Sequence, residues 1–123
     1  MAKLLGIDFG GTRTGLALAD TTVKVALPFK TLLAENLSDE LKKIIETENI
    51  DLIVVGWPIN FSGQETEQTL EVKKFIEQLS LIFTHTIVKQ DERLTTRQAE
   101  RQGGDDSLAA AYILQSYLDS LHG

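Results

Sequence analysis

The sequence predicts an α/β domain with a five-stranded mixed sheet, on the basis of three observations. Residues 3–27 contain three apolar or alternating runs, the first two joined by a pair of glycines, which is typical of antiparallel strands. Beyond Ser38, helical patterns alternate with strand patterns, so the later strands should run parallel and be joined by crossover helices. The length of 123 residues suits a single domain over 1–123 and excludes a second lobe.

The first half of the chain is expected to form three strands. KLLGIDF at 3–9 is apolar on both faces, which favours a central strand, and Gly10-Gly11 turns the chain into the next strand at 14–20. Residues 23–27 alternate in polarity and are expected to form the third strand, which Pro28 ends.

The second half is expected to alternate helices with strands, because apolar residues recur first at helical spacing and then in short continuous runs. The predicted elements are a helix with Ser38 as its N-cap, a strand at 51–56 that Gly56-Trp57-Pro58 ends, a helix containing Val72, Phe75, Ile76 and Leu79, a strand at 86–90, a short helix near Thr95, and a last helix from about 106 to 121.

This order of elements matches the ribonuclease H-like fold, in which helices flank the sheet. It also matches the first half of an actin-like or sugar-kinase lobe, and GIDFGGTRTGLALAD is similar to the first phosphate loop of sugar kinases. The stretch lacks the Lys and the glycine spacing of a P-loop or a Rossmann fingerprint. Because an actin-like clamp needs two lobes, the length of the chain favours the ribonuclease H-like alternative.

Composition excludes several classes of protein. The chain has no cysteine, so it has neither a disulfide framework nor a thiolate site. Asp8 interrupts the first apolar run, and no run is long enough to cross a membrane, so we expect a cytoplasmic protein without a signal peptide. The net charge of -6 counts against a nucleic-acid partner, although a local basic face can coexist with an acidic total.

Asp8 is the first candidate functional residue. Strand periodicity places it on one face with Leu4 and Gly6, where an isolated carboxylate is costly to bury. One interpretation is a cap on the Gly10-Gly11 turn, and the other is a ligand for a metal ion or a metal-bound phosphate.

The second acidic stretch is DERLTTRQAER at 91–101. Asp91 and Glu92 stand where the fifth predicted strand gives way to a loop, a common place for functional residues in α/β sheets. Arg97 and Arg101 are four residues apart and could share a helix face with Arg93 nearby, where they would meet phosphates or remain solvated surface residues.

Asp106 heads the third acidic stretch and the apolar stripe of the last helix. The stripe consists of Ala110, Ile113, Leu114, Tyr117 and Leu121. Asp105 or Asp106 is expected to cap this helix, and the other acid can then face the sheet.

Three acids near one edge of a sheet would repel one another unless a hard cation joins them. Mg²⁺ or Mn²⁺, as one or two ions, suits such ligands and the hydrolysis of a phosphodiester bond. The spacing of the sequence offers neither a Ser-His-Asp arrangement nor a zinc site.

Four stretches of the chain resemble the signature blocks of the YqgF/RuvX family: LLGIDFGGTRTGLALAD, IVVGWPINFSGQE, DERLTT and DDSLAAAYILQSYLD. They span nearly the whole chain in the family's order. The resemblance implies a ribonuclease H-like nuclease that processes pre-16S ribosomal RNA at its 5′ end or resolves Holliday junctions.

The resemblance carries the family's catalytic and metal-binding acids onto Asp8, Glu92 and Asp106. It adds Arg13, a basic residue of the first turn, and Asn60 of the second block. With Arg93 and Arg97, these two are expected to contact nucleic acid, and Trp57 either stacks on a base or packs over a strand end. Only RQAERQGGD separates Thr96 from Asp106, where the family has a longer and often basic segment.

The favoured hypothesis is therefore a hydrolase, an Mg²⁺- or Mn²⁺-dependent endonuclease acting on an rRNA precursor or branched DNA, and either a monomer or a weak homodimer. A second hypothesis is a non-catalytic module of the same fold that binds nucleic acid or a transcription partner. The nucleotide-binding kinase-like lobe is the third.

Overall fold

The computed structural model describes residues 1–93 and 106–121, with Arg93 described as backbone only. A five-stranded sheet in the order β3-β2-β1-β4-β5 forms its centre. The elements are β1 (Lys3–Asp8), β2 (Arg13–Asp20), β3 (Leu27–Leu33), the 3-10 turn η1 (Ala34–Asn36), α1 (Leu37–Thr47), β4 (Leu52–Ile59), α2 (Glu67–Ile82), β5 (Thr86–Arg93) and α4 (Asp106–Ser120).

β1 is the central strand, as its two apolar faces predict. It runs antiparallel to β2, with Leu5 opposite Leu18, and parallel to β4, with Leu5 beside Ile53. β3 adds antiparallel to β2, and β5 adds parallel to β4. The predicted mixed sheet, with hairpins first and parallel crossovers afterwards, is thus confirmed.

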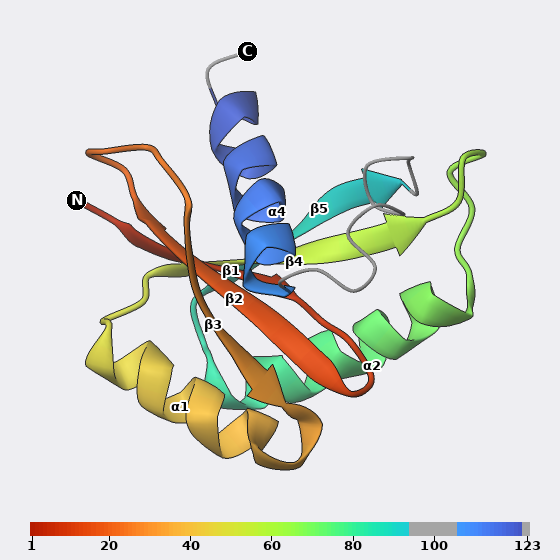
Figure 1. Ribbon diagram of the computed structural model, residues 1–123, viewed down its shortest axis with the longest axis horizontal. Coiled ribbons are helices and arrows are strands. Elements are labelled where there is room, and N and C mark those ends of the chain that lie inside the picture. The colour runs from red at the N-terminus through yellow and green to blue at the C-terminus, as the bar shows by residue number, and fades with distance from the viewer. Residues whose placement is uncertain (94–105, 122–123) are drawn as a thin grey trace.

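Helices cover both faces of the sheet (Figure 1). α1 and α2 pack on one face through Leu41, Val72 and Leu79, against residues such as Ile7 of β1. Of the described helices, α4 is the one that packs on the other face, where Leu114 is completely buried. The alternation of side chains along β1 therefore separates residues that face α4 from residues that face α1 and α2.

The predicted third strand at 23–27, ended by Pro28, is wrong. Asp20 instead caps a turn by accepting hydrogen bonds from the backbone of Thr22 and Val23, and Lys24 has a φ of 62°. β3 follows at Leu27–Leu33 and contains Pro28. Proline is tolerated there because β3 is an edge strand, where a missing N–H need not break the ladder.

The predicted ends of two other strands are too early. β4 continues through Pro58 to Ile59, because β1 pairs with it only as far as Val55, which leaves an open side for proline. β5 continues beyond residue 90 because it pairs with β4 along this whole length.

The start of α1 also differs from the prediction. Ser38 lies inside α1 and is not its N-cap, since the 3-10 turn η1 leads directly into the helix. The last helix begins at Asp106 as predicted, whereas Leu121 is exposed just beyond its end. The short helix predicted near Thr95 lies outside the described residues.

Within the described ranges, no helix combines the length and the apolar character that crossing a bilayer requires.

Candidate functional site

Asp8 ends β1 on the face that α4 covers. Gly6, two residues earlier, faces α4 directly, because a Cβ on it would lie 2.7 Å from the Cβ of Leu114. Asp8 continues this face by strand periodicity and is half-buried. The first candidate acid therefore lies beside α4, on the side of the sheet away from α1 and α2.

The start of α4 lies against the strand next to Asp8. Asp8 pairs with Gly15 of β2, and a Cβ on Gly15 would lie only 1.8 Å from the backbone oxygen of Asp106. The absence of a side chain at Gly15 is what allows this approach. Despite the short segment that precedes it, Asp106 thus reaches the end of β1.

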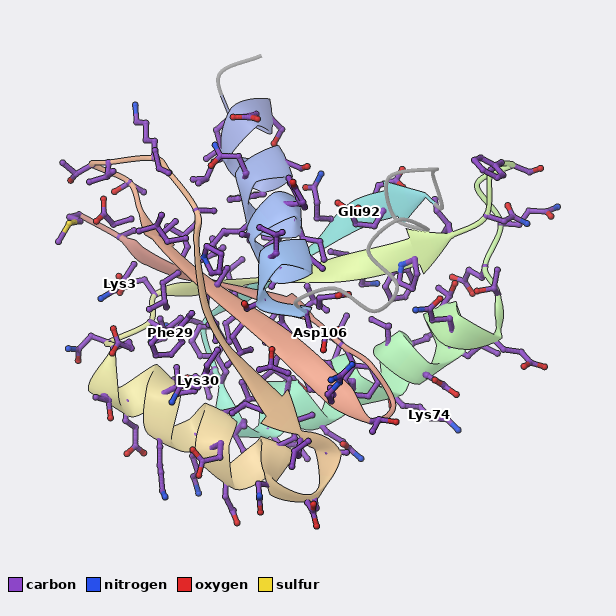
Figure 2. The ribbon with its side chains drawn as sticks, viewed as in Figure 1. Lys3, Phe29, Lys30, Lys74, Glu92 and Asp106 are labelled. Carbon is purple, nitrogen blue, oxygen red and sulfur yellow. The ribbon has the colours of Figure 1, made fainter. Side chains whose placement is uncertain are left out.

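Glu92 reaches the same face from the far side of β4. It belongs to β5 and pairs with Pro58. Its Cγ lies 3.6 Å from where a Cβ on Gly56 would stand, and the side chain of Ile113 from α4 lies 2.6 Å from that point. Figure 2 shows Glu92 on β5 and Asp106 at the first turn of α4, both on the face of the sheet that α4 covers.

Arg13 pairs with Asp106. Its Nε lies 3.2 Å from Oδ2 of that carboxylate, with the Arg13 side chain 56% exposed and the Asp106 side chain 30% exposed. Arg13 opens β2 two residues before Gly15, so the ion pair and the close backbone contact join the same two elements. Asp106 also stands at the positive end of the α4 dipole, which favours a carboxylate there.

The carboxylates at this face fit a hard divalent cation by chemistry. Mg²⁺ prefers oxygen ligands and usually takes one or two protein carboxylates while keeping several waters. Within residues 1–93 and 106–121, no three His, Cys, Asp or Glu side chains lie close enough to hold one metal ion together. Among these residues the three predicted acids therefore do not gather around a single ion, and one or two carboxylates completed by water and substrate is the ligand set that Mg²⁺ commonly takes.

Asn60 organises the loop after β4. Its Oδ1 accepts hydrogen bonds from the backbone N–H groups of Ser62 and Gln64, each at 2.9 Å. The backbone N–H of Asn60 donates to the backbone carbonyl of Gln64. Gly63 adopts a φ of 81°, which this tight loop requires. The side-chain oxygen of Asn60 thus holds the loop, and the expected contact with nucleic acid stays a prediction.

Trp57 lies away from the candidate acids. It packs against the core that α1 and α2 share with the sheet, opposite the face of Gly56, and the Nζ of Lys89 lies 4.5 Å from its ring centroid. Packing over the strand, one of the two interpretations of this residue, is what the structure shows. Arg97 lies outside the described residues, and so does the side chain of Arg93.

Gly15 and Gly56 are the residues of the site that motif reasoning did not single out. Both are strand glycines, and glycine inside a strand often marks a close approach of another segment. That signal was present in the sequence, but it does not say which segment approaches.

Comparison with known sequences finds one family model and many relatives that match this chain. A sequence model of the RuvX family, described as Holliday junction resolvase, matches residues 2–120. A protein of Rickettsia africae (strain ESF-5) named "Putative pre-16S rRNA nuclease" is 36% identical over 135 aligned positions, covering 98% of this chain and 88% of the relative. A protein of the same name from Endomicrobium trichonymphae is also 36% identical, covering 97% of this chain and 96% of the relative. These alignments are longer than the chain, so the relatives contain residues that have no counterpart here.

Solved structures share the fold. Thermus thermophilus RuvC in complex with a Holliday junction substrate superimposes with a TM-score of 0.63 at 10% identity, covering 100% of this chain and 97% of RuvC. The fowlpox virus Holliday junction resolvase gives a TM-score of 0.58 at 13% identity, covering 97% and 99%. At these identities the likeness concerns the fold alone, and it confirms the predicted ribonuclease H-like fold.

Proposed function

Because the chain belongs to the RuvX family of Holliday junction resolvases, we propose that it is a nuclease that hydrolyses phosphodiester bonds in structured nucleic acid. The observation that supports the proposal most is the placement of Asp8, Glu92 and Asp106. Strands β1 and β5 and the start of α4 bring these acids to one face of the sheet. Three separate segments of the chain thus each place an acid on this face.

The proposed cofactor is Mg²⁺ or Mn²⁺, as one or two ions, each held by one or two of the carboxylates of Asp8, Glu92 and Asp106. Bound divalent ions of this kind make water nucleophilic at neutral pH and neutralise charge on the leaving oxygen. The chain itself supplies the positions: Asp8 extends from a buried central strand, and the backbone of Asp106 rests on Gly15. Ligands on such rigid elements keep their places when a phosphate binds.

Precursor 16S ribosomal RNA is the first substrate to test, because relatives at 36% identity are named for it. A four-way DNA junction is the second, on the description of the family. Arg93, Arg97 and Asn60 are proposed to contact the backbone of either nucleic acid. We further propose that the protein acts in the cytoplasm, where rRNA precursors are processed, as a monomer or a weak homodimer.

The test is cleavage of both substrates by the wild-type protein, Asp8→Asn and Asp39→Asn. The control Asp39 is an exposed acid of α1, on the face of the sheet opposite α4. We expect cleavage of the precursor RNA with Mg²⁺ or Mn²⁺, none with EDTA, and a loss of about 100-fold or more in Asp8→Asn alone.

Cleavage that survives Asp8→Asn would overturn the assignment of the site. Binding of nucleic acid without cleavage under any metal would instead support the non-catalytic module of the same fold. Cleavage of the junction but not of the RNA would identify branched DNA, and not the rRNA precursor, as the substrate.

A further inference from the structure

The contact between Arg13 and Asp106 suggests a role for Arg13 other than binding nucleic acid. The guanidinium meets a carboxylate of the proposed metal site through Nε at 3.2 Å. An arginine that binds a phosphate frequently does so in bidentate fashion, through two parallel N–H groups of its guanidinium. Here part of its hydrogen-bonding capacity is used inside the site.

The ion pair joins two elements whose relative position decides where Asp106 lies. β2 carries both Arg13 and Gly15, and the backbone oxygen of Asp106 rests on Gly15. The backbone contact fixes the start of α4, whereas the ion pair fixes the direction of the Asp106 side chain. Partners that orient metal ligands in this way set metal affinity and activity in many sites.

The positive charge of Arg13 also acts on the group of acids as a whole. Carboxylates on one face repel each other, and a guanidinium beside one of them lowers that repulsion. Arg13 is 56% exposed, so solvent screens its charge and the geometric effect should outweigh the electrostatic one. Removal of Arg13 should therefore weaken metal binding, although it also removes a cation from the site.

We propose that Arg13 is a positioning residue that orients the Asp106 carboxylate and holds the first turn of α4 on β2. This inference rests on the proposed function as far as the metal is concerned, while the anchoring of α4 is independent of it. A residue that binds substrate would affect KM and nucleic-acid affinity, whereas a positioning residue affects metal affinity and kcat.

The first experiment measures hydrogen exchange in the first turn of α4 and Mn²⁺ affinity by calorimetry, neither of which requires cleavage. The variants are Arg13→Gln, Arg13→Lys and Lys3→Gln. The last is a matched control, because it breaks the 3.0 Å ion pair of Lys3 with Glu48 and removes the same charge; Figure 2 shows Lys3 and its distance from the first turn of α4, where Asp106 lies. Lys3 stands at the opposite end of β1 from Asp8.

For Arg13→Gln we expect α4 exchange to be about two- to fivefold faster, the factor that an exposed ion pair allows. Mn²⁺ affinity should fall about tenfold, as for other partners of metal ligands, and Arg13→Lys should recover part of both losses. Lys3→Gln should leave both quantities unchanged. Unchanged α4 exchange together with unchanged or tighter Mn²⁺ binding in Arg13→Gln would overturn the proposal.

The second experiment compares Asp8→Asn with Asp8→Asn/Arg13→Gln for binding of labelled precursor RNA in EDTA. Equal affinities within about twofold support positioning, whereas a loss that also flattens the salt dependence identifies Arg13 as a phosphate contact. If the wild-type protein binds no metal and cleaves nothing, the proposed function fails. The exchange measurement then still decides whether Arg13 anchors α4.

Discussion

Gly15 is a strand residue whose missing side chain lets α4 touch the sheet. The residue pairs with Asp8, and the backbone of Asp106 occupies the space where a Cβ would stand. Gly11, four residues earlier, is different, because a Cβ there would meet no described atom within 4 Å. Of these two glycines of one motif, only Gly15 is needed for close packing, because a neighbouring backbone occupies the space beside it.

Gly15→Ala should therefore displace the start of α4, whereas Gly11→Ala should not. We expect Gly15→Ala to lower the free energy of unfolding by about 1–3 kcal/mol, the usual cost of overpacking. Gly11→Ala should change it by no more than about 0.5 kcal/mol. Urea denaturation followed by circular dichroism measures both, and equal stability of the two variants would contradict the close contact at Gly15.

At the scale of elements, the junction between β4 and α2 is held by threonine side chains. Thr66 caps α2, and its backbone N–H donates to the hydroxyl of Thr69 at 2.8 Å. The buried hydroxyl of Thr69 in turn donates to the backbone oxygen of Pro58 in β4. One hydroxyl thus ties the start of a helix to the end of the strand beside Glu92.

Thr69→Val should be more destabilising than Thr66→Ala, because it leaves both the Pro58 oxygen and the Thr66 N–H without this partner. We expect losses of about 1–3 kcal/mol for Thr69→Val and about 1 kcal/mol for Thr66→Ala. Ser38→Ala is the control, since Ser38 lies within α1 and does not cap it. Thermal or urea denaturation tests this order, and a large loss in the Ser38 variant would show that the serine caps α1 after all.

At the scale of the whole molecule, β3 is one of the two end strands of the described sheet and carries exposed apolar residues, among them Leu27 and Leu33. Such an edge can pair with a second copy unless it is interrupted. Pro28 removes a donor, the register shifts between Pro28 and Lys30, and Lys30 adds a charge that lies 5.1 Å from the ring centroid of Phe29. These features all oppose edge-to-edge pairing.

We accordingly expect the wild-type protein to be monomeric at micromolar concentration and the double variant Pro28→Val/Lys30→Val to self-associate. Size-exclusion chromatography with light scattering measures the mass of each. Lys74→Val is the control, because it adds a similar apolar side chain on α2, away from any strand edge (Figure 2). A double variant that stays monomeric would show that these two residues do not protect the edge.

Local patterns predicted the elements where propensity and burial agree. The apolar run of β1, the stripe of Val72, Phe75 and Leu79 in α2, and the start of α4 at Asp106 all follow from the sequence. Predictions failed where a neighbouring strand decides the outcome. Pro28 and Pro58 look like strand breakers, yet each lies inside a strand, because no described strand pairs with it on one of its two sides.

By itself the sequence determined the kind of fold and predicted three candidate acids, because periodicity and four family motifs are properties of the chain alone. The meeting of Asp106 with Arg13 and Gly15 was decided by the tertiary structure. Asp106 is far from Arg13 and Gly15 in the chain, and no local rule states how closely a helix approaches a strand. Packing of α4 on the sheet sets that distance, and with it the place of the third acid and the partner of Arg13.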